Sequence, residues 1–374
     1  MLMTAATSAL PDVRPLVDLL LSEALRQRAS DIHVEPAADF CEVRLRVDGV
    51  LETYKKLEPS VGRAVVTRLM VMARLLTYRL DVPQEGRISV PTSCDNPAVE
   101  LRLSIMPTIH GMRAAVRMPA EHVQPAILED LSLPPSVLKG LIGFASADSG
   151  MLILTGPAGS GKTTTIYALL HHISRVNPGL SIIALEDPVE RDVPGVTQIE
   201  VSPFGQLKYE KALRSILRQD PQVLMLGEVR DAATASLAVQ AALSGHRLIT
   251  ALHAATPAGA LARLLEMGIE PYQLTSSIRA IVAQRLLRRR SVDAQGYHGR
   301  APIAEFVAMD PALKKCLLQR GDSDCLARAY QGQPGYQSLR DVGQLLVQQG
   351  VTDTAELGRV VDLKCSEDSN GNGR

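Results

Sequence analysis

The segment from Met151 to Thr164, MLILTGPAGSGKTT, constrains the fold of this chain more than any other stretch. Its apolar residues at 151–154 predict a buried parallel strand, and the next residues fit G-x-x-x-x-G-K-[ST], a loop that binds nucleotide phosphates. Glycines allow successive backbone N–H groups to turn toward phosphate oxygens without a Cβ clash. We expect a helix from about Thr163 to Arg175, with its positive N-terminal end facing the same anion. A glycine-rich turn with a stray lysine is the alternative, but the flanking strand and helix count against it.

The residues expected to bind the nucleotide form one continuous run: Gly156, Pro157, Ala158, Gly159, Ser160, Gly161, Lys162, Thr163 and Thr164. Within this run, Lys162 places a point charge near the β- and γ-phosphates, and the Thr163 hydroxyl can ligate Mg²⁺. ATP and Mg²⁺ are therefore the cofactors that the sequence predicts.

The overall composition argues against a general nucleic-acid binder. Lys and Arg total 40 and Asp and Glu total 40, so the net charge is zero, whereas nucleic-acid-binding proteins are usually basic. Aromatic residues make up 3% of the chain and Trp is absent, which leaves few side chains to stack on single-stranded bases. We expect no nucleic-acid partner, although a local basic groove stays compatible with these numbers.

Cysteine spacing and hydropathy indicate a cytoplasmic protein. None of the five cysteines forms C-x-x-C, so we expect reduced thiols and no structural zinc. No apolar run approaches the roughly 18 residues that span a bilayer, and the N-terminus lacks the pattern of a secretory signal. Membrane association would then be peripheral and would depend on a partner.

Residues 11–118 predict a small α+β domain. Helical spacing covers about 15–28 and 61–76, and apolar residues alternate with charged ones at 41–47 and 99–105, as in strands with one charged face. Arg87, Arg102 and Arg117 lie on or beside these strands, so they are candidate functional residues. An ordinary solvated sheet face is the alternative.

A different pattern follows a proline-punctuated segment at 119–135, which we interpret as a linker. In 136–290, apolar strands alternate with longer helices, which predicts α/β architecture with a parallel sheet covered on both faces. Beyond Arg263 the chain is expected to be mostly helical, with a helical C-terminal part at 291–363 and a disordered tail at 364–374.

Acids at two predicted strand ends are candidates for metal and water chemistry. Glu186 and Asp187 follow one strand and Glu228 follows another, at the edge where open α/β sheets bind ligands. Glu228 is the best candidate for water activation, and pairing with Arg230 is its alternative. Together with Thr163, Glu186 and Glu228 are the expected magnesium ligands.

A third predicted strand ends at His253, which could sense the γ-phosphate or be merely structural. Gln284 to Arg290 is predicted to be a basic helix end, which fits either helix capping or a binding patch.

Several ordered motifs resemble those of the type II secretion and type IV pilus assembly ATPases. The similarity extends from about Val17 to Val361. In the first domain it rests on ASDIHVEP at 29–36, LRVDG at 45–49 and QEGRI at 84–88. In the second it rests on GPAGSGKTTT, on LEDPVE at 185–190, on LRQDPQVLMLGEVRD at 217–231 with Gly227 in the usual Asp position, on HRLITALHA at 246–254 and on GYHGRAPIAEF at 296–306.

The resemblance implies a PAS-like N-terminal domain joined to a RecA-like ATPase domain in a homo-hexameric ring. Such a ring lies on the cytoplasmic face of the inner membrane and drives pilin-like subunits into a filament through an inner-membrane platform protein. It also implies catalytic roles for Glu228, Glu186 and His253, and for Arg87, Arg102 and Arg117 from the N-terminal domain or a neighbouring subunit.

The chain departs from the family pattern in three ways. We interpret it as starting after the extra N-terminal docking domain of many members. The four-cysteine zinc loop expected between Arg290 and Tyr297 is missing, and Leu252–Ala255 reads LHAA where the family usually has LHTN. A RecA-like nucleic-acid translocase and a nucleotide-binding regulatory scaffold are the competing interpretations.

Overall fold

The computed structural model describes residues 12–90, 99–118, 127–201, 209–291 and 296–361. The chain divides into two compact units, Met1–Val123 and Gln124–Arg374, and each is described by itself. None of the described helices is long and apolar enough to cross a membrane.

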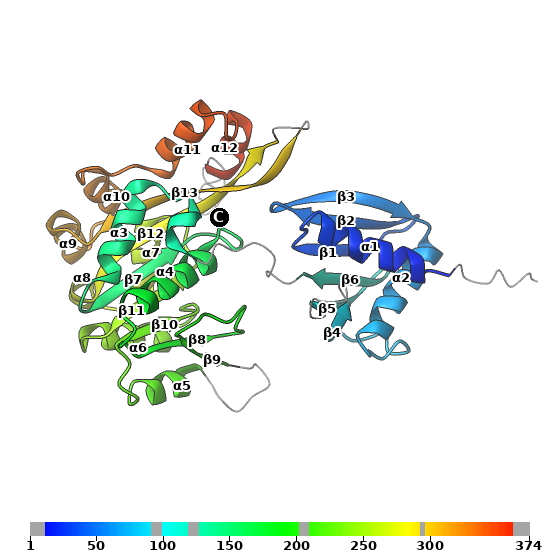
Figure 1. The fold of residues 1–374 in the computed structure, drawn as a ribbon, viewed down its shortest axis with the longest axis horizontal. Coiled ribbons are helices and arrows are strands. Elements are labelled where there is room, and N and C mark those ends of the chain that lie inside the picture. The colour runs from blue at the N-terminus through cyan, green and yellow to red at the C-terminus, as the bar shows by residue number, and fades with distance from the viewer. Residues whose placement is uncertain (1–11, 91–98, 119–126, 202–208, 292–295, 362–374) are drawn as a thin grey trace, which may run out of the picture. The chain divides into compact units, whose positions relative to one another are not determined.

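The N-terminal unit is an antiparallel six-stranded sheet with two helices, as its α+β pattern predicts (Figure 1). The strand order is β3-β2-β1-β6-β5-β4. Its elements are α1 (Arg14–Arg26), β1 (Asp31–Pro36), β2 (Cys41–Val47), β3 (Val50–Leu57), α2 (Pro59–Met72), β4 (Gln84–Val90), β5 (Val99–Thr108) and β6 (Gly111–Arg117).

One face of this sheet packs on the helices and the other carries charge. Alternate strand residues such as Ile32, Val34 and Leu103 are buried together with Val65 and Leu69 of α2. Because successive strand residues point to opposite faces, the intervening arginines and acids share the other face.

The C-terminal unit is built on a seven-stranded sheet in the order β13-β12-β7-β11-β10-β8-β9. All neighbours in it pair in parallel except β12 and β13, which form an antiparallel hairpin. The strands are β7 (Gly150–Thr155), β8 (Ile182–Glu186), β9 (Thr197–Glu200), β10 (Val223–Leu226), β11 (Arg247–Leu252), β12 (Ile278–Arg290) and β13 (Tyr297–Ala308).

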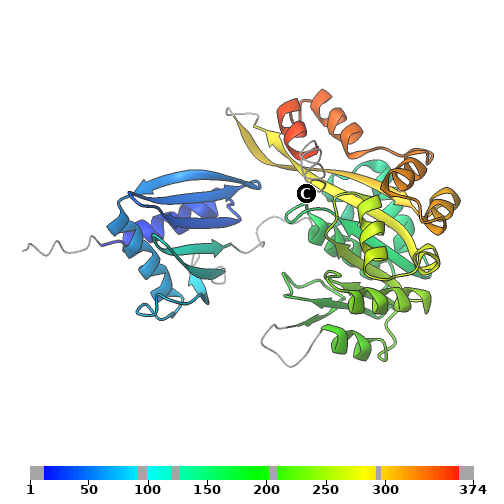
Figure 2. The ribbon, with the colours of Figure 1, turned by 180° about the vertical axis from the view of Figure 1, so that it is seen from behind.

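Helices cover both faces of this sheet (Figures 1 and 2). Alternate residues of β7 enter different cores, since Met151 and Ile153 pack on one side and Leu152 and Leu154 on the other. The described helices of this unit are η1 (Leu128–Leu131), α3 (Pro135–Ala145), α4 (Lys162–Val176), α5 (Tyr209–Ile216), α6 (Ala232–Leu243), α7 (Pro257–Glu266), α8 (Pro271–Ser277), α9 (Pro311–Leu318), α10 (Ser323–Gln331), α11 (Leu339–Gln348) and α12 (Thr354–Val361).

The expectation of a mostly helical chain beyond Arg263 is wrong for β12 and β13. The predicted basic helix end from Gln284 to Arg290 is strand, and the expected boundary at 290 falls inside a hairpin of the main sheet. Strand β12 lies between β7 and β13 and is buried on both faces over most of its length, so its residues lack the alternation that identifies a strand.

The C-terminal helix α12 packs on this hairpin through a buried ion pair, and α11 packs there through apolar contact. The side chain of Glu356 is fully buried and accepts hydrogen bonds from the backbone and guanidinium of Arg288 and from Arg359. Val342 and Leu357 complete a small apolar cluster with Leu287 of β12. The helical C-terminal part is thus attached to the sheet by both charge and apolar contact.

Two smaller predictions also need correction. Part of the predicted linker at 119–135 belongs to the second unit, because Leu128, Leu131 and Leu133 are buried in its core, whereas 119–126 lies outside the described residues. The prediction that all thiols are reduced is wrong for Cys316 and Cys325, which form a disulfide between α9 and α10. The predicted tail at 364–374 also lies outside the described residues.

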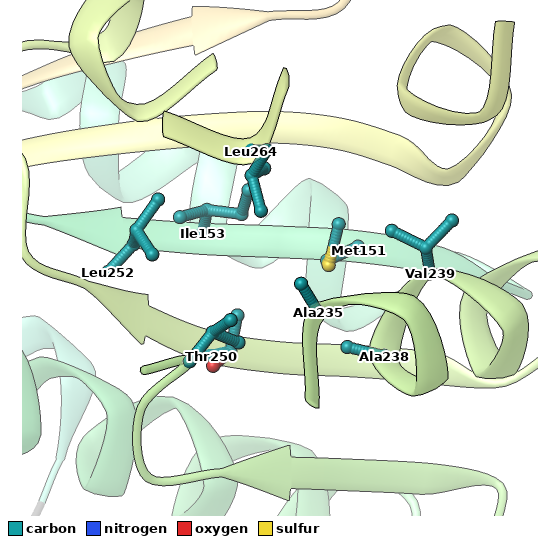
Figure 3. A pocket seen from close by; sticks show the side chains of 9 residues that line it. Met151, Ile153, Ala235, Ala238, Val239, Thr250, Leu252 and Leu264 are labelled. Atoms are coloured by element: carbon teal, nitrogen blue, oxygen red, sulfur yellow. The ribbon is translucent and has the colours of Figure 1, made fainter. Parts of the chain in front are cut away.

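A small apolar cavity of about 10 Å³ lies where α6 and α7 pack on the sheet (Figure 3). It is about the size of one water molecule, and its almost wholly apolar lining offers few of the polar partners that a water needs. The side chains that line it include Met151, Ile153, Ala238 and Leu264.

We predict that Leu264→Ala destabilises the C-terminal unit by about 2–5 kcal/mol, because it enlarges an existing void in a core that relaxes only partially. The measurement is the free energy of unfolding in urea. Leu243→Ala on α6, where the side chain is 44% exposed, is the matched control and should change stability by only about 0.5 kcal/mol. Equal losses in the two variants would contradict the prediction.

Candidate nucleotide site

The predicted phosphate loop connects the end of β7 to the start of α4, as the sequence pattern requires. Three of its glycines have positive φ angles: +152° at Gly156, +71° at Gly159 and +88° at Gly161. A Cβ at Gly156 would lie 2.5 Å from the Ser160 hydroxyl and 2.6 Å from the Gln284 carbonyl, whereas one at Gly159 would meet open space. Both its backbone conformation and its close packing therefore require glycine at position 156.

The Lys162 side chain folds over this loop. Its Nζ donates hydrogen bonds of 2.8 Å to the carbonyls of Gly156 and Pro157, and only 8% of the residue is exposed. Burial lowers the pKa of Lys162 to about 8, and the nearby Arg285 charge acts in the same direction. The ammonium is thus held beside the backbone where β- and γ-phosphates are expected to bind.

Strand β12 supports the loop through two side chains of the segment that was predicted to be a helix end. Gln284 accepts a 2.8 Å hydrogen bond from the Thr165 hydroxyl, and its amide closely approaches Gly161. Arg285 donates to the Gln284 carbonyl at 2.9 Å and to the Ala255 carbonyl at 2.5 Å. Both side chains are buried. A Gln-Arg pair inside a long apolar run was the only signal in the sequence for this role.

Glu228 and His253 are brought together at the ends of the neighbouring strands β10 and β11. His253 Nε2 lies 2.8 Å from Glu228 Oε2, and the other carboxylate oxygen accepts from Arg230. Arg230 also donates to Asp187 at 3.1 Å. Burial raises the pKa of Glu228, but the hydrogen bonds and charges of Arg230 and His253 outweigh it and hold the pKa below its ordinary value. Glu228 is therefore a carboxylate at neutral pH.

Glu186 lies at the end of β8 as predicted, but in a different environment. It is 3% exposed, and its carboxylate accepts hydrogen bonds from the Tyr167 hydroxyl and from Gln198 at 2.9 Å. Burial raises the pKa of Glu186. Its catalytic and metal-binding roles stay predictions, and Glu228 is the more accessible of the two acids.

A cavity of about 290 Å³ connects these strand ends to the helix that follows the loop. Thr163, Glu186, Asp187 and Glu228 all contribute to its lining. Hydroxyl and carboxylate oxygens are the ligands that Mg²⁺ prefers, so this donor set fits a magnesium ion bound together with a phosphate. Among the described residues, no group of three or more His, Cys, Asp or Glu is arranged to hold a metal by itself. The absence of zinc stays a prediction, to be checked by metal analysis.

The three candidate arginines form one row across the N-terminal sheet. Arg102 on β5 is directly opposite Arg87 on β4 and Arg117 on β6, so all three side chains share the charged face. Arg87 pairs with Glu100 at 3.2 Å and Arg117 with Asp31 at 3.3 Å. All three arginines are exposed.

The parallel sheet, the glycine loop and the acids at the adjoining strand ends define a P-loop nucleotide-binding protein. The profile of the family described as "Type II/IV secretion system protein" matches residues 7–359, and this chain belongs to that family.

Relatives with curated names agree with this assignment. The chain is 37% identical over 364 residues to the type II secretion system protein HxcR of Pseudomonas aeruginosa, covering 92% of this chain and 76% of that protein. It is 34% identical over 380 residues to the type II secretion system ATPase E of Vibrio cholerae, with coverage of 92% and 74%. The type IV pilus assembly ATPase PilB of Thermus thermophilus is 32% identical over 384 residues, which span 92% of this chain and 43% of PilB.

Solved structures share the fold. The ATPase DotB of Yersinia pseudotuberculosis matches with a TM-score of 0.75 and 20% identity, covering 96% of both chains. The pilus retraction motor PilT with bound ADP matches with a TM-score of 0.63 and 22% identity, over 92% of this chain and 96% of that one. The fold shared with these two structures therefore extends over nearly the whole chain.

We predict that Gly156→Ala weakens ADP binding at least tenfold more than Gly159→Ala does. Both positions have positive φ, which costs an L-residue about 1–2 kcal/mol, but only Gly156 adds a clash with the backbone of β12. Equilibrium titration with a fluorescent ADP analogue measures the two affinities. Equal affinities in the two folded variants would show that β12 does not constrain the loop.

Proposed function

We propose that this chain is an ATP-hydrolysing motor that powers assembly of a type II secretion pseudopilus or a type IV pilus. The observation that carries the proposal is the meeting of Glu228 and His253 at the strand ends beside the loop that holds Lys162 and Thr163. The names of the relatives support the coupling of this chemistry to secretion or pilus assembly.

In this proposal the loop and α4 bind the phosphates. Backbone N–H groups and the helix N-terminus attract the anion, and Lys162 exchanges its two carbonyl contacts for phosphate oxygens. Thr163 and the acids of the cavity would hold Mg²⁺, which when bound neutralises charge on the phosphates.

Glu228 orients the attacking water and accepts its hydrogen bond. The carboxylate is already ionised because Arg230 and His253 stabilise its charge. Each of its oxygens has one contact with these partners and keeps a further lone pair for a water molecule. In this proposal His253, which lies beside Glu228, responds to the γ-phosphate.

The larger assembly follows from the family resemblance. We infer a homo-hexamer at the cytoplasmic face of the inner membrane, attached to an inner-membrane platform protein and not itself inserted in the bilayer. The antiparallel sheet with α1 and α2 on one face supports a PAS-like N-terminal domain, and the parallel sheet of the C-terminal unit supports a RecA-like one.

We predict that Lys162→Ala abolishes ATP turnover, and that Glu228→Gln binds ATP but hydrolyses it at least about a hundredfold more slowly. The first variant loses the phosphate charge, whereas the second keeps the shape of Glu228 and loses its basicity. Steady-state hydrolysis and nucleotide titration are measured on folded protein, with and without single-stranded DNA. Unchanged turnover in Lys162→Ala would refute the assignment, and strong stimulation by DNA would favour a translocase.

We further predict that Arg87, Arg102 and Arg117 act on nucleotide bound by another subunit. Replacing all three by alanine should lower turnover by roughly 10³-fold or more, as expected for guanidinium groups that stabilise charge on the γ-phosphate. The decisive assay mixes this triple variant with Lys162→Ala protein, because a mixed ring can combine intact arginines with an intact loop. If both variants assemble and the mixtures stay inactive, the arginines do not act across subunits.

A further inference from the structure

The turn that follows β11 carries His253 but has few polar side chains to hold it. The next two residues are Ala254 and Ala255, so any fixed position of the histidine must come from contacts of the backbone. His253 itself is about half exposed, since 46% of its side chain is accessible. An exposed imidazole on an unsupported turn would lose its orientation toward Glu228.

The Thr155 hydroxyl supplies such a contact from the end of β7. It donates a 2.7 Å hydrogen bond to the Ala254 carbonyl and accepts a 3.2 Å hydrogen bond from the Ala254 N–H. The same N–H also lies 3.0 Å from the Leu252 carbonyl. Thr155 is completely buried and immediately precedes Gly156, so one side chain connects the start of the phosphate loop to the histidine turn.

Two arginines hold the same turn at its neighbouring carbonyls. Arg285, which lies against the backbone of Gly156, donates to the Ala255 carbonyl at 2.5 Å. Arg263 of α7 donates to the His253 carbonyl at 2.6 Å. The turn is thus fixed at three consecutive residues by groups from β7, β12 and α7.

We propose that Thr155 is a positioning residue for turnover, which acts with Arg285 by fixing the turn that presents His253 to Glu228. The proposal rests on the proposed function, because it assigns Thr155 a role in the same hydrolysis. Its physical basis is that a hydroxyl paired with both polar groups of one residue restrains that residue in two directions. The γ-methyl of Thr155 provides packing alone, and a valine would replace it.

A neighbouring threonine offers a matched control. Thr250 on β11 is 2% exposed, and among the residues that the structure describes its hydroxyl makes only a 3.4 Å contact, with the Ala251 carbonyl. Replacing either threonine by valine removes a buried hydroxyl from the same sheet and keeps the side-chain shape. Only the change at Thr155 releases the histidine turn.

The experiment compares Thr155→Val, Thr155→Ser and Thr250→Val in the full chain. We expect Thr155→Val to lower kcat for ATP about tenfold with KM and ADP affinity within twofold of the wild type, Thr155→Ser to recover most of the rate, and Thr250→Val to stay near wild type. A loss of ADP affinity that matches the loss of rate would overturn the proposal, because Thr155 would then serve the phosphate loop alone.

A double-mutant cycle tests whether Thr155 acts through the histidine. Single-turnover hydrolysis is followed in Thr155→Val, His253→Ala and the double variant, at equal content of folded protein. We expect the double variant to be no slower than His253→Ala. Independent, multiplicative losses would overturn the proposal, as would a His253→Ala variant as fast as the wild type.

A second variant covers the case in which Thr155→Val does not fold. Arg285→Lys keeps a positive charge beside the loop but loses the guanidinium that donates to the Gln284 and Ala255 carbonyls. Its loss of turnover should likewise add nothing to that of His253→Ala in a double variant. Failure of the proposed function is separately visible, because turnover would then survive in Lys162→Ala. If Lys162→Ala abolishes turnover but the losses in Thr155→Val and His253→Ala are independent, the proposed function holds and only the positioning role of Thr155 is wrong.

Discussion

The parallel pairing of β7, β11, β10 and β8 is the constraint on which the rest of the C-terminal unit depends. Parallel strands in consecutive register bring their carboxyl ends to one edge, so Thr155, His253, Glu228 and Glu186 lie along the same edge although they are far apart in sequence. The backbone hydrogen bonds of the sheet continue past the strands, since the N–H of Val229 donates to the Ala251 carbonyl and that of Gly227 to the Leu185 carbonyl. The positions of the acids are thus set by main-chain bonds.

The antiparallel hairpin of β12 and β13 contributes two buried polar side chains beside this edge. Arg285 on β12 and Glu305 on β13 are almost fully buried, and a charge in such a place is stable only when it is paired or hydrogen-bonded. Arg285 donates hydrogen bonds to two backbone carbonyls, and Glu305 accepts a 2.6 Å hydrogen bond from the Tyr336 hydroxyl. The hairpin therefore contacts the phosphate loop on one side and the C-terminal helical part on the other.

The sequence was most informative where a single local pattern determines the structure. The strand, loop and helix around Lys162 are correctly predicted, because short apolar runs alternate with helices. So are the strand that ends at Glu186 and the strands that end just before Glu228 and His253. Strand β12 was missed because burial on both faces removes its alternation. The contacts of Thr155 with Ala254, 99 residues away, have no local signal, since both residues depend on the pairing of β7 with β11.

The arginine row on the N-terminal sheet has an electrostatic consequence of its own. Directly opposite residues in an antiparallel pair have Cβ atoms about 5 Å apart, and like charges at that distance destabilise the pairing. Arg102 faces an arginine on each side, and β4, which carries Arg87, is the edge strand. Glu100 and Asp31, which pair with Arg87 and Arg117, offset part of this repulsion. Salt screens the repulsion and the ion pairs alike. The cohesion of this edge is therefore coupled to the ionic surroundings of the sheet.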